Sequence, residues 1–404
     1  MSATTFHNLE ILLYDWRMNN LRQHFLLDPS VTFLNHGSFG ATPKPVYREY
    51  QRWQREMERQ PVEFLGRRIP HLLAEARSAL ADYLGTQAGN LIFTQNVTVS
   101  LNIVARSLDL GVGDEVLTTD HEYGAIDRTW RFLAKERGFA YISQALTTPF
   151  TTAEQFVEDL WSGVTPRTKV ICLSHITSPT AIIFPLQELI RQARAHGILT
   201  VIDGAHVAGQ IPLQLDELGA DFYGGNLHKW LCAPKGAGFL YARPEVQHLL
   251  KPLVVSWGYE SLTPSGSTFI DHNDWWGTRD HSAFLAVPAA IRFQQENHWD
   301  EVRDSCHELV AYAQNRICEL TGLAALHPSA RAWFAQMAAA PLPADTDLTL
   351  LKNRLYDEYR IEVPLTEWQG NKFVRISVQG YNTRRDVDAL IRALRAILSE
   401  RRTV

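Results

Sequence analysis

The chain has 404 residues, of which 45% are hydrophobic, and its formal net charge is −5. This length predicts one large domain with a small one, or two to three domains of ordinary size. The weak negative charge provides no basic field for nucleic acid or anionic lipid, and no window approaches the roughly 18 apolar residues that a membrane span needs.

The N-terminal segment and the cysteines indicate the compartment. The chain does not open with a basic region followed by a long apolar core, so no signal peptide is predicted. The four cysteines are far apart and form no CxxC pair, which argues against a zinc site or a disulfide framework. We therefore expect a soluble, cytoplasmic protein that binds no metal.

Between residues 90 and 245, short β-rich runs alternate with helical patterns. Seven strands are predicted, at Leu91–Thr94, Glu115–Thr119, Phe139–Ser143, Lys169–Ser174, Leu199–Asp203, Asp221–Gly224 and Gly238–Ala242. The helices predicted between them are Val97–Leu108, Ala125–Arg137, Ala153–Trp161 and Leu186–His196. This alternation predicts an α/β fold with a mostly parallel sheet covered on both faces. The last two strands are joined by too few residues for a helical crossover, so the last is expected to be antiparallel.

The pattern changes after about Leu285. Helices are predicted at Ala283–Gln295 and Trp299–Leu320, short strands at Ile361–Val363 and Phe373–Val378, and an amphipathic helix at the C-terminus. We predict a large α/β domain over residues 30–285 and a smaller α+β domain from residues 1–29 and 286–404. The polar stretch Ser261–Asp274 is expected to be a long loop near an active site or a subunit contact.

Two strand ends carry the most informative residues. The apolar run Leu199–Ile202 delivers Asp203 at its carboxyl end, and the run Asp221–Gly224 is followed by Lys229. Chemistry in open α/β sheets lies beyond the carboxyl ends of the strands, so both side chains are expected at one site. A lysine and a buried acid are the two groups that a protein supplies to pyridoxal phosphate (PLP). Taken singly, an Asp-Gly pair after a strand is more often part of a turn, and a lysine near a glycine-rich loop is more often a solvated surface residue.

Two further strand ends carry candidate residues. Gln95–Thr98 lies between a strand and a helix, where free backbone amides bind phosphate and Thr98 adds a hydroxyl, although simple capping by Asn96 is the alternative. Tyr123 follows another strand end, where an aromatic ring could stack on a cofactor or only pack in the core.

Eight ordered stretches of the chain resemble the class V aminotransferase family of fold-type I PLP enzymes, and most of all its isopenicillin N epimerase-like branch. They are Phe33–Gly40, Phe93–Thr98, Asp120–Ala125, Ser174–Thr180, Asp203–His206, Leu227–Lys229, Gly277–Asp280 and Arg375–Thr383. The resemblance extends over nearly the whole chain. It implies PLP as the cofactor, an amino acid as the substrate and a homodimer as the assembly.

The resemblance also implies roles for single residues. Lys229 would form the Schiff base with PLP, Asp203 would keep the pyridine nitrogen protonated, His206 would lie near the ring, and Tyr123 would stack on the face opposite Lys229. The remaining cofactor contacts would come from Val97, Thr98, Ser178, Asn226, His228 and, from a partner subunit, Thr278. Thr98, Asn226, His228 and Thr278 would bind the phosphate, and Ser178 stands where relatives often have an asparagine near the phenolic oxygen. Gly37 and Arg375 would bind the substrate, with Arg375 holding its carboxylate as a bidentate fork.

Other polar residues near these motifs have plainer interpretations. His121 and His175 are expected to be structural, whereas His36 and Ser38 lie in a loop expected to border the substrate. The pair Trp275 and Trp276 could line a substrate pocket or pack at an interface.

The position of the cysteines bears on the reaction. Cysteine desulfurases of this family need a nucleophilic cysteine on a late mobile loop, and the corresponding region, about residues 327–347, contains none. An amino-acid epimerase is therefore the first prediction, with a C–S or β-elimination lyase and an aminotransferase as alternatives. A non-enzymatic scaffold is disfavoured because Lys229, Asp203 and Arg375 are all present.

Overall fold

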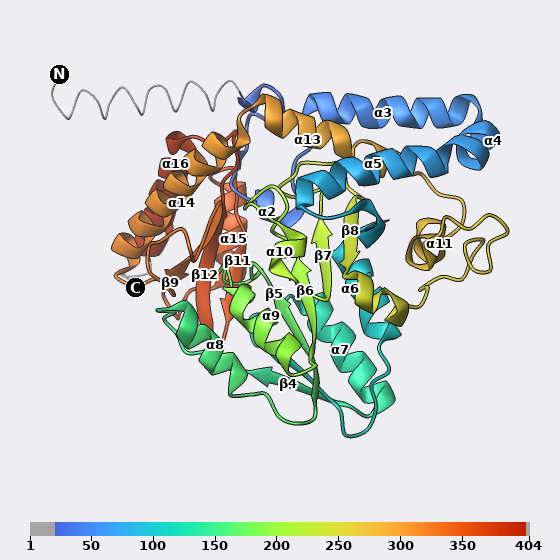
Figure 1. Ribbon diagram of the computed structural model, residues 1–404. Helices are drawn as coiled ribbons and strands as arrows, with labels where there is room; N and C mark the ends of the chain where they lie inside the picture. Colours follow the sequence, from blue (N-terminus) through green and yellow to red (C-terminus); the bar gives the residue numbers. More distant parts are fainter. Residues whose placement is uncertain (1–20, 401–404) are drawn as a thin grey trace, which may run out of the picture. The chain divides into compact units, whose positions relative to one another are not determined.

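The computed structural model describes residues 21–400, which form two compact units (Figure 1). The large unit comprises Pro45–Ser178 and Phe184–Gln294, and the small unit comprises the other described residues, including the short segment Pro179–Ile183. The predicted folding domains, residues 30–285 for the large one and 1–29 with 286–404 for the small one, stay a prediction. Residues 1–20 and 401–404 lie outside the described part of the chain.

A seven-stranded sheet forms the centre of the large unit, and all seven predicted strands are present. Its order is β2-β8-β7-β6-β5-β3-β4. Neighbouring strands are parallel except at β8, which is antiparallel to both β2 and β7, as the short connection from β7 predicted. The strands are β2 (Leu91–Thr94), β3 (Glu115–Thr119), β4 (Ala140–Gln144), β5 (Thr168–Ser174), β6 (Leu199–Gly204), β7 (Phe222–Asn226) and β8 (Gly238–Ala242).

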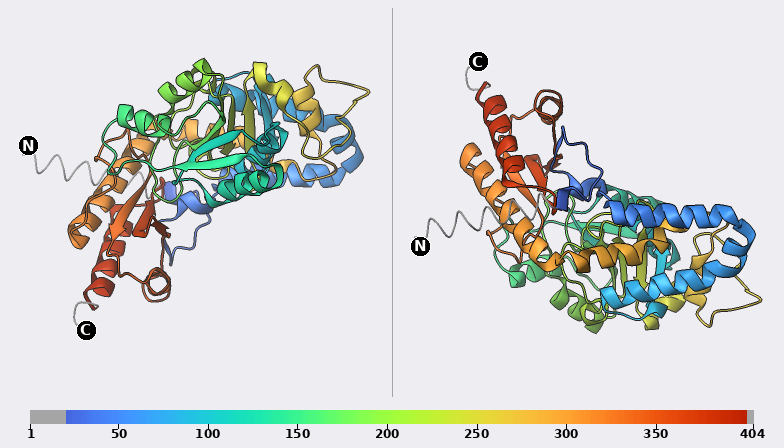
Figure 2. Two further views of the ribbon diagram at one scale, coloured as in Figure 1. Left: turned by 90° about the horizontal axis from the view of Figure 1, so that it is seen from below. Right: turned by 90° about the horizontal axis from the view of Figure 1, so that it is seen from above.

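Helices cover both faces of this sheet, with α6 and α7 on one side and α8 and α9 on the other (Figure 2). The four helices predicted here are present with their ends shifted by one residue at most. They are α6 (Val97–Ser107), α7 (Gly124–Arg137), α8 (Ala153–Trp161) and α9 (Leu186–Ala195). Val104 of α6 and Trp130 of α7 are completely buried in the core on their side of the sheet. Burial on both faces explains why the central strands are continuous apolar runs rather than alternating patterns.

Two long helices precede the sheet and were not predicted. They are α3 (Lys44–Arg59) and α5 (Ile69–Leu84). Helix α3 buries only Val46, so it lacks the broad apolar stripe that identifies a helix in a sequence. Shorter elements of this unit are α4 (Pro61–Glu63), η1 (Phe64–Arg68), η2 (Ala88–Asn90), α10 (Leu215–Leu218) and η3 (Pro244–Leu249).

Two predictions for the end of the large unit were wrong. Helix α11 (Thr268–Asp274) occupies the second half of the expected loop, because Ser267 caps it by accepting a hydrogen bond from the Ile270 amide at 3.3 Å. The single helix expected over residues 283–295 is instead two helices, α12 (Ser282–Leu285) and α13 (Val287–Glu296). Pro288 lies in the first turn of α13, where a residue without an N–H is tolerated and favours a helix start.

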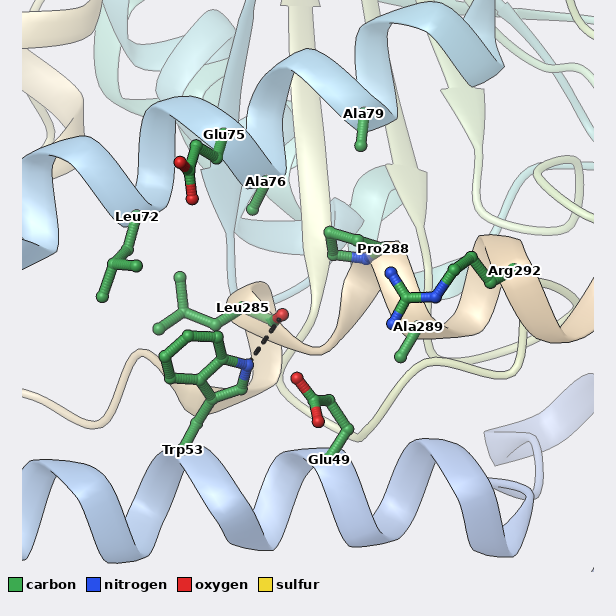
Figure 3. Close-up of a pocket in the computed structure, with 10 residues that line it drawn as sticks. All are labelled: Glu49, Trp53, Leu72, Glu75, Ala76, Ala79, Leu285, Pro288, Ala289 and Arg292. Carbon is green, nitrogen blue, oxygen red and sulfur yellow. Dashed lines mark hydrogen bonds between the residues drawn. The ribbon is translucent and has the colours of Figure 1, made fainter.

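A cavity of about 230 Å³ lies among α3, α5, α12 and α13 (Figure 3). The carboxylates of Glu49 and Glu75 and the guanidinium of Arg292 lie around it, with mostly apolar side chains between them. The indole of Trp53 donates a hydrogen bond to the Leu285 carbonyl at 3.1 Å and so connects α3 to α12. None of the candidate cofactor-binding residues lines this cavity, so it is not the candidate active site.

The small unit contains two short sheets and three long helices. One sheet pairs β1 (Thr32–Phe33) with β10 (Ile361–Glu362), and the other has the order β11-β12-β9. Strands β10 and β12 (Asn371–Ser377) were predicted, whereas β9 (Met337–Leu342) and β11 (Leu365–Trp368) were not. The helices are α14 (Trp299–Thr321), α15 (Leu348–Asp357) and α16 (Arg384–Glu400), preceded by the short α2 (His36–Phe39). This is the α+β arrangement expected of the C-terminal part.

In residues 21–400, every helix is too short or too polar to span a membrane.

Candidate active site

The carboxyl ends of β6 and β7 bring the principal candidate residues together in the large unit. Asp203 is the penultimate residue of β6 and lies in register with Gly224 of β7. Asn226 ends β7, and Lys229 follows three residues later. Because the two strands are parallel neighbours, their carboxyl ends deliver an acid, an amide and an amine to one edge of the sheet.

Asp203 is buried, with 2% of its surface exposed, and its two carboxylate oxygens differ. Oδ1 accepts a hydrogen bond from the Ala205 amide at 2.9 Å, whereas Oδ2 has no hydrogen-bond partner among residues 21–400. Burial raises the pKa of Asp203 to about 6, against the lowering effects of the Ala205 amide and the Lys229 charge. A buried acceptor without a donor is unfavourable, so this atom fits a ligand that carries an N–H group.

Lys229 contacts the ring of His206. The Lys229 Nζ lies 3.2 Å from His206 Nε2, and the Trp230 indole donates a hydrogen bond to His206 Nδ1 at 3.2 Å. Trp230 is completely buried and His206 is 1% exposed. The half-buried lysine, the buried histidine and the buried tryptophan thus form one chain of contacts beside Asp203.

The N-terminus of α6 lies against the end of β7. Asn226 Oδ1 accepts a hydrogen bond from the Val97 amide at 2.9 Å, and Asn96 caps the helix by accepting from the Val99 amide at 3.1 Å. A Cβ atom at Gly224 would lie 3.0 Å from Val97 Cγ2, so glycine allows this close approach of helix and strand. Of the first three helical amides, only that of Thr98 has no acceptor within residues 21–400. Together with its hydroxyl, Thr98 offers a small anion site at the positive end of the helix.

His228 lies next to Lys229 with its ring oriented by the backbone. Its Nδ1 lies 3.2 Å from the Ala237 carbonyl, which requires Nδ1 to carry a proton. Burial lowers the pKa of His228 to about 4, and the charge of Lys229 acts in the same direction. The neutral ring therefore presents Nε2 as an acceptor, which suits a protonated phosphate oxygen better than a fully ionised one.

Glu122 is a half-buried acid that the sequence did not single out. Its Oε1 lies 2.7 Å from Thr119 Oγ1, and its Oε2 lies 2.8 Å from the Ser174 amide and 2.7 Å from Ser174 Oγ. Ser174 pairs with Asp203 across β5 and β6. Burial raises the pKa of Glu122 to about 8, and the charge of Asp203 contributes to the increase. The only signal in the sequence was its position after a strand, because nothing there indicates how deeply an acid is buried.

Tyr123, next to Glu122, precedes the first residue of α7. Its side chain is 45% exposed, unlike the completely buried tyrosines of this unit. Ser178 ends the first segment of the large unit, four residues after β5, and is half-buried. Thr278 is exposed in the connection between α11 and α12, after Gly277 with a positive φ of 99°. The large unit of one chain therefore leaves both Tyr123 and Thr278 accessible.

Arg375 and Gly37 belong to the small unit, where a chain of hydrogen bonds starts from one nitrogen of the guanidinium. Arg375 Nη2 donates to Ser38 Oγ at 3.3 Å, and the Ser38 hydroxyl donates to Asn35 Oδ1 at 2.5 Å. Asn35 Nδ2 then donates to Glu362 Oε1 at 2.9 Å. Arg375 is 5% exposed and Asn35 is 8% exposed, whereas Ser38 and Glu362 are half-buried. Gly37 is buried in α2, between His36 and Ser38.

The other histidines have structural environments. His36, in the loop expected to border the substrate, is completely buried, and its Nδ1 lies 2.9 Å from the Tyr381 hydroxyl. His121 is completely buried against Phe150 and Phe184. His175 Nδ1 lies 3.0 Å from the Tyr223 hydroxyl.

The expected aromatic pair is half-buried in the connection between α11 and α12. Trp275 stacks on His281 with ring centroids 5.6 Å apart, and the guanidinium of Arg279 lies over the ring of Trp276. Within residues 21–400, no group of three or more histidine, cysteine and acidic side chains is arranged so that it could bind a metal ion.

Comparison with known proteins identifies relatives over almost the whole chain. The chain is similar to the isopenicillin N epimerase of Amycolatopsis lactamdurans, with 37% identity over 94% of this chain and 98% of that one. It is similar to the isopenicillin N epimerase of Streptomyces clavuligerus, with 34% identity over 96% and 99%. The L-cysteine desulfhydrase-like protein lolT2 of Epichloe uncinata is 26% identical over 93% of this chain and 92% of its own.

Solved structures with the same fold include two at 22% identity. One is a mutant of C-DES with glycine covalently linked to its PLP cofactor, with a TM-score of 0.80 over 93% of this chain and 98% of that one. The other is the apo structure of a cysteine desulfurase from Thermococcus onnurineus NA1, with a TM-score of 0.80 over 94% and 98%. The class-V aminotransferase model matches residues 40–390. The seven-stranded sheet, the small C-terminal sheet and the sequence relatives agree, and the chain belongs to the class-V aminotransferase family.

Proposed function

We propose that this protein binds PLP and inverts the α-carbon of an amino-acid substrate, as an isopenicillin N epimerase-like enzyme. The observation that carries the cofactor assignment is the buried Oδ2 of Asp203, which has no donor within residues 21–400, beside an amine. The identities of 37% and 34% to isopenicillin N epimerases support the reaction.

The residues present fit PLP. Asp203 Oδ2 would accept a hydrogen bond from the pyridine N–H, Lys229 would provide the amine for the Schiff base, and the Thr98 amide and hydroxyl would bind the phosphate. Val97, Ser178, Asn226, His206 and His228 would complete the contacts within one chain. When bound, the cofactor supplies an electron sink for the bonds at the α-carbon.

Lys229 and Tyr123 would handle the α-proton. Lys229 reaches only the side of the ring that it occupies, so it can remove or return a proton on that side alone. Inversion requires a donor on the opposite side, and Tyr123 is the residue that we assign there. Its 45% exposure fits a side chain that a cofactor ring covers on binding. The phenol would then act as a general acid as well as a stacking surface.

Arg375 would bind the substrate carboxylate, and Gly37 would lie against the substrate. A guanidinium forms two parallel hydrogen bonds with a carboxylate, which a lysine cannot reproduce. In the small unit, the relay through Ser38 and Asn35 occupies one edge of the guanidinium.

We propose a homodimer in which Thr278 completes the phosphate site of the partner. The exposure of Thr278 in the connection between α11 and α12 fits a contact outside its own chain. The cytoplasm is the location we propose, because the four cysteines within residues 21–400 form no disulfide and fit a reducing compartment.

A lyase that breaks a C–S bond or eliminates a β-substituent is the second candidate, favoured by the similarity to the desulfhydrase-like protein. An aminotransferase would use the same Lys229 and Asp203. The three reactions differ in their products, which are the inverted enantiomer, an eliminated group with a keto acid, and a transferred amino group.

One experiment tests the proposal. The PLP-loaded protein is incubated with a panel of L-amino acids and short peptides bearing a free α-amino acid terminus, and the products are separated on a chiral column. The expected result for the wild type is formation of the other enantiomer. Lys229→Ala should lose all turnover and also the yellow colour that PLP bound to the lysine would give the protein. Sulfide or a keto acid without any inverted product would establish the lyase or the aminotransferase instead.

A further inference from the structure

The contacts of His206 assign it a role beyond lying near the cofactor. We propose that His206, oriented by Trp230, is a positioning residue that holds Lys229 as a neutral amine. This inference rests on the proposed function, because the neutral amine is the form that the function needs. It arises from the directions of two hydrogen bonds on one ring.

The indole of Trp230 fixes the proton on the His206 ring. An indole N–H is a donor only, so His206 Nδ1, 3.2 Å from Trp230 Nε1, must be the acceptor. A neutral imidazole has one acceptor nitrogen and one N–H, and the proton is therefore on Nε2. An imidazolium would place an N–H against the indole N–H, so it does not fit this contact.

The position of that proton determines what Lys229 can do. Lys229 Nζ lies 3.2 Å from His206 Nε2. An ammonium group has three donors and no acceptor. Next to the Nε2–H group of His206, two N–H groups would therefore point at each other without an acceptor. A neutral amine has a lone pair that accepts the Nε2–H hydrogen bond. The two contacts are compatible with each other only when Lys229 is uncharged.

The surrounding chain holds His206 and Trp230 in this orientation. The carbonyl of His206 accepts a hydrogen bond from Gln210 Nε2 at 2.6 Å, and the carbonyl of Trp230 accepts one from Gln294 Nε2 at 2.8 Å. Gly209 has a φ of 92°, and a Cβ atom there would lie 2.4 Å from the Trp230 carbonyl oxygen. Only glycine allows the backbone after His206 to approach Trp230 so closely.

The charged and titratable groups around Lys229 act in both directions. Asp203 on β6 favours the ammonium form, and its charge interaction with Lys229 lowers the pKa of the acid. Glu122, whose pKa rises to about 8, interacts with Asp203. His228 is neutral near pH 7 because burial lowers its pKa to about 4. The hydrogen bond from His206 therefore opposes the attraction of Asp203 for a charged lysine.

The neutral amine serves both steps that the proposed function assigns to Lys229. Condensation with the PLP aldehyde forms a carbon–nitrogen bond through the amine lone pair, and the aldehyde oxygen leaves as water. Removal of the α-proton uses the same lone pair, which takes the proton while the bonding electrons stay with the substrate. An ammonium group can do neither.

The test follows the uptake of PLP by the cofactor-free protein from pH 6 to pH 10. Trp230→Phe keeps the aromatic bulk and removes the indole N–H, so His206 can turn its acceptor toward an ammonium group. One hydrogen bond of ordinary strength corresponds to about one pH unit, so uptake should be about tenfold slower at pH 7 and equal to wild type at high pH. Trp161→Phe, at the end of α8, is the matched control and should leave the profile unchanged.

Two variants of His206 address the same point without altering Trp230. His206→Gln can accept from the indole through its oxygen and donate to Lys229 through its amide, so it should keep the wild-type pH profile. His206→Leu can do neither and should shift the profile as Trp230→Phe does. The acetylation rate of Lys229 in the cofactor-free protein, measured by peptide mass spectrometry, should fall in His206→Leu and Trp230→Phe and stay at the wild-type value in His206→Gln, since only the neutral amine reacts.

The outcomes separate this inference from the proposed function. If the wild-type protein takes up no PLP at any pH, the proposed function is wrong. If it takes up PLP and all variants share its pH profile and acetylation rate, the cofactor assignment stands and the role of His206 is refuted.

Discussion

Replacing Glu122 with glutamine should stabilise the protein, and increasingly so as the pH rises. Glu122 is half-buried and hydrogen-bonded to Thr119 and Ser174, and desolvation raises its pKa from 4.5 to about 8. The folded protein therefore keeps this carboxyl protonated at pH values where the unfolded chain has released the proton. A protonated carboxyl has one donor and one acceptor end, and a glutamine amide has the same pattern.

The magnitude follows from the two pKa values. Between them, the free energy of unfolding of the wild type falls by about 1.4 kcal/mol per pH unit because the unfolded chain loses a proton that the folded chain retains. The contribution of Glu122 is fully present below pH 4.5 and lost by about pH 8. Glu122→Gln has no such loss, so its advantage should grow to about 2 kcal/mol at pH 6 and about 5 kcal/mol above pH 8.

Guanidinium denaturation at several values between pH 5 and pH 8.5 measures this difference, with the wild type and the variant treated in parallel. Glu154→Gln, an exposed substitution in the first turn of α8, is the control and should show a small difference that is the same at every pH. A constant difference for Glu122→Gln, or one that shrinks as the pH rises, would refute the assignment of a protonated Glu122.

Three further predictions concern substrate and cofactor binding. Arg375→Lys should raise the Michaelis constant of amino-acid substrates about thirtyfold, roughly 2 kcal/mol, with the bound-PLP spectrum unchanged, because a point charge replaces a planar fork; an unchanged constant for every substrate would remove Arg375 from the carboxylate site. Asn35→Leu breaks the relay between Ser38 and Glu362 and should raise the Michaelis constant about three- to tenfold with kcat retained. When Arg375 is already replaced by lysine, adding Asn35→Leu should not raise the Michaelis constant further. An equal increase with and without Arg375→Lys would show that Asn35→Leu disturbs the protein in general. Thr278→Ala should weaken PLP retention by roughly 1.5–3 kcal/mol in a dialysis assay, and sedimentation should show a dimer; a fully active monomer would contradict the shared site.

The parts of the fold that the sequence predicted share one property, which is local regularity. Runs such as Leu199–Gly204 are buried along almost their whole length because both faces of the sheet are covered, and short turns separate them from helices. Strand β9 was missed because Met-Ala-Ala-Ala-Pro-Leu has no β-branched residue, and only its pairing with β12 makes it a strand. Helix α3 was missed for a different reason, because it buries only Val46 and therefore shows no broad apolar stripe.

The candidate site shows the same division. Asp203 and Lys229 could be predicted at one edge of the sheet because each follows a recognisable strand. The hydrogen bonds of Glu122 and the ring orientation of His206 depend on neighbours that are distant in sequence, among them Ser174 and Trp230. His36 illustrates the limit of a motif, because its place in a conspicuous loop does not indicate that the ring is completely buried and hydrogen-bonded to Tyr381.

The most direct test of the central claim is inversion of a substrate in deuterated water by the wild type and by Tyr123→Phe. If Lys229 and Tyr123 act on opposite sides, the wild type should incorporate deuterium at the α-carbon and yield both enantiomers. Tyr123→Phe should keep PLP bound and keep the exchange that depends on Lys229, while inversion falls roughly 100-fold or more. Inversion at the wild-type rate in Tyr123→Phe would reduce Tyr123 to a stacking surface. A wild-type protein that exchanges the α-proton of its substrates and inverts none of them would contradict the epimerase assignment itself.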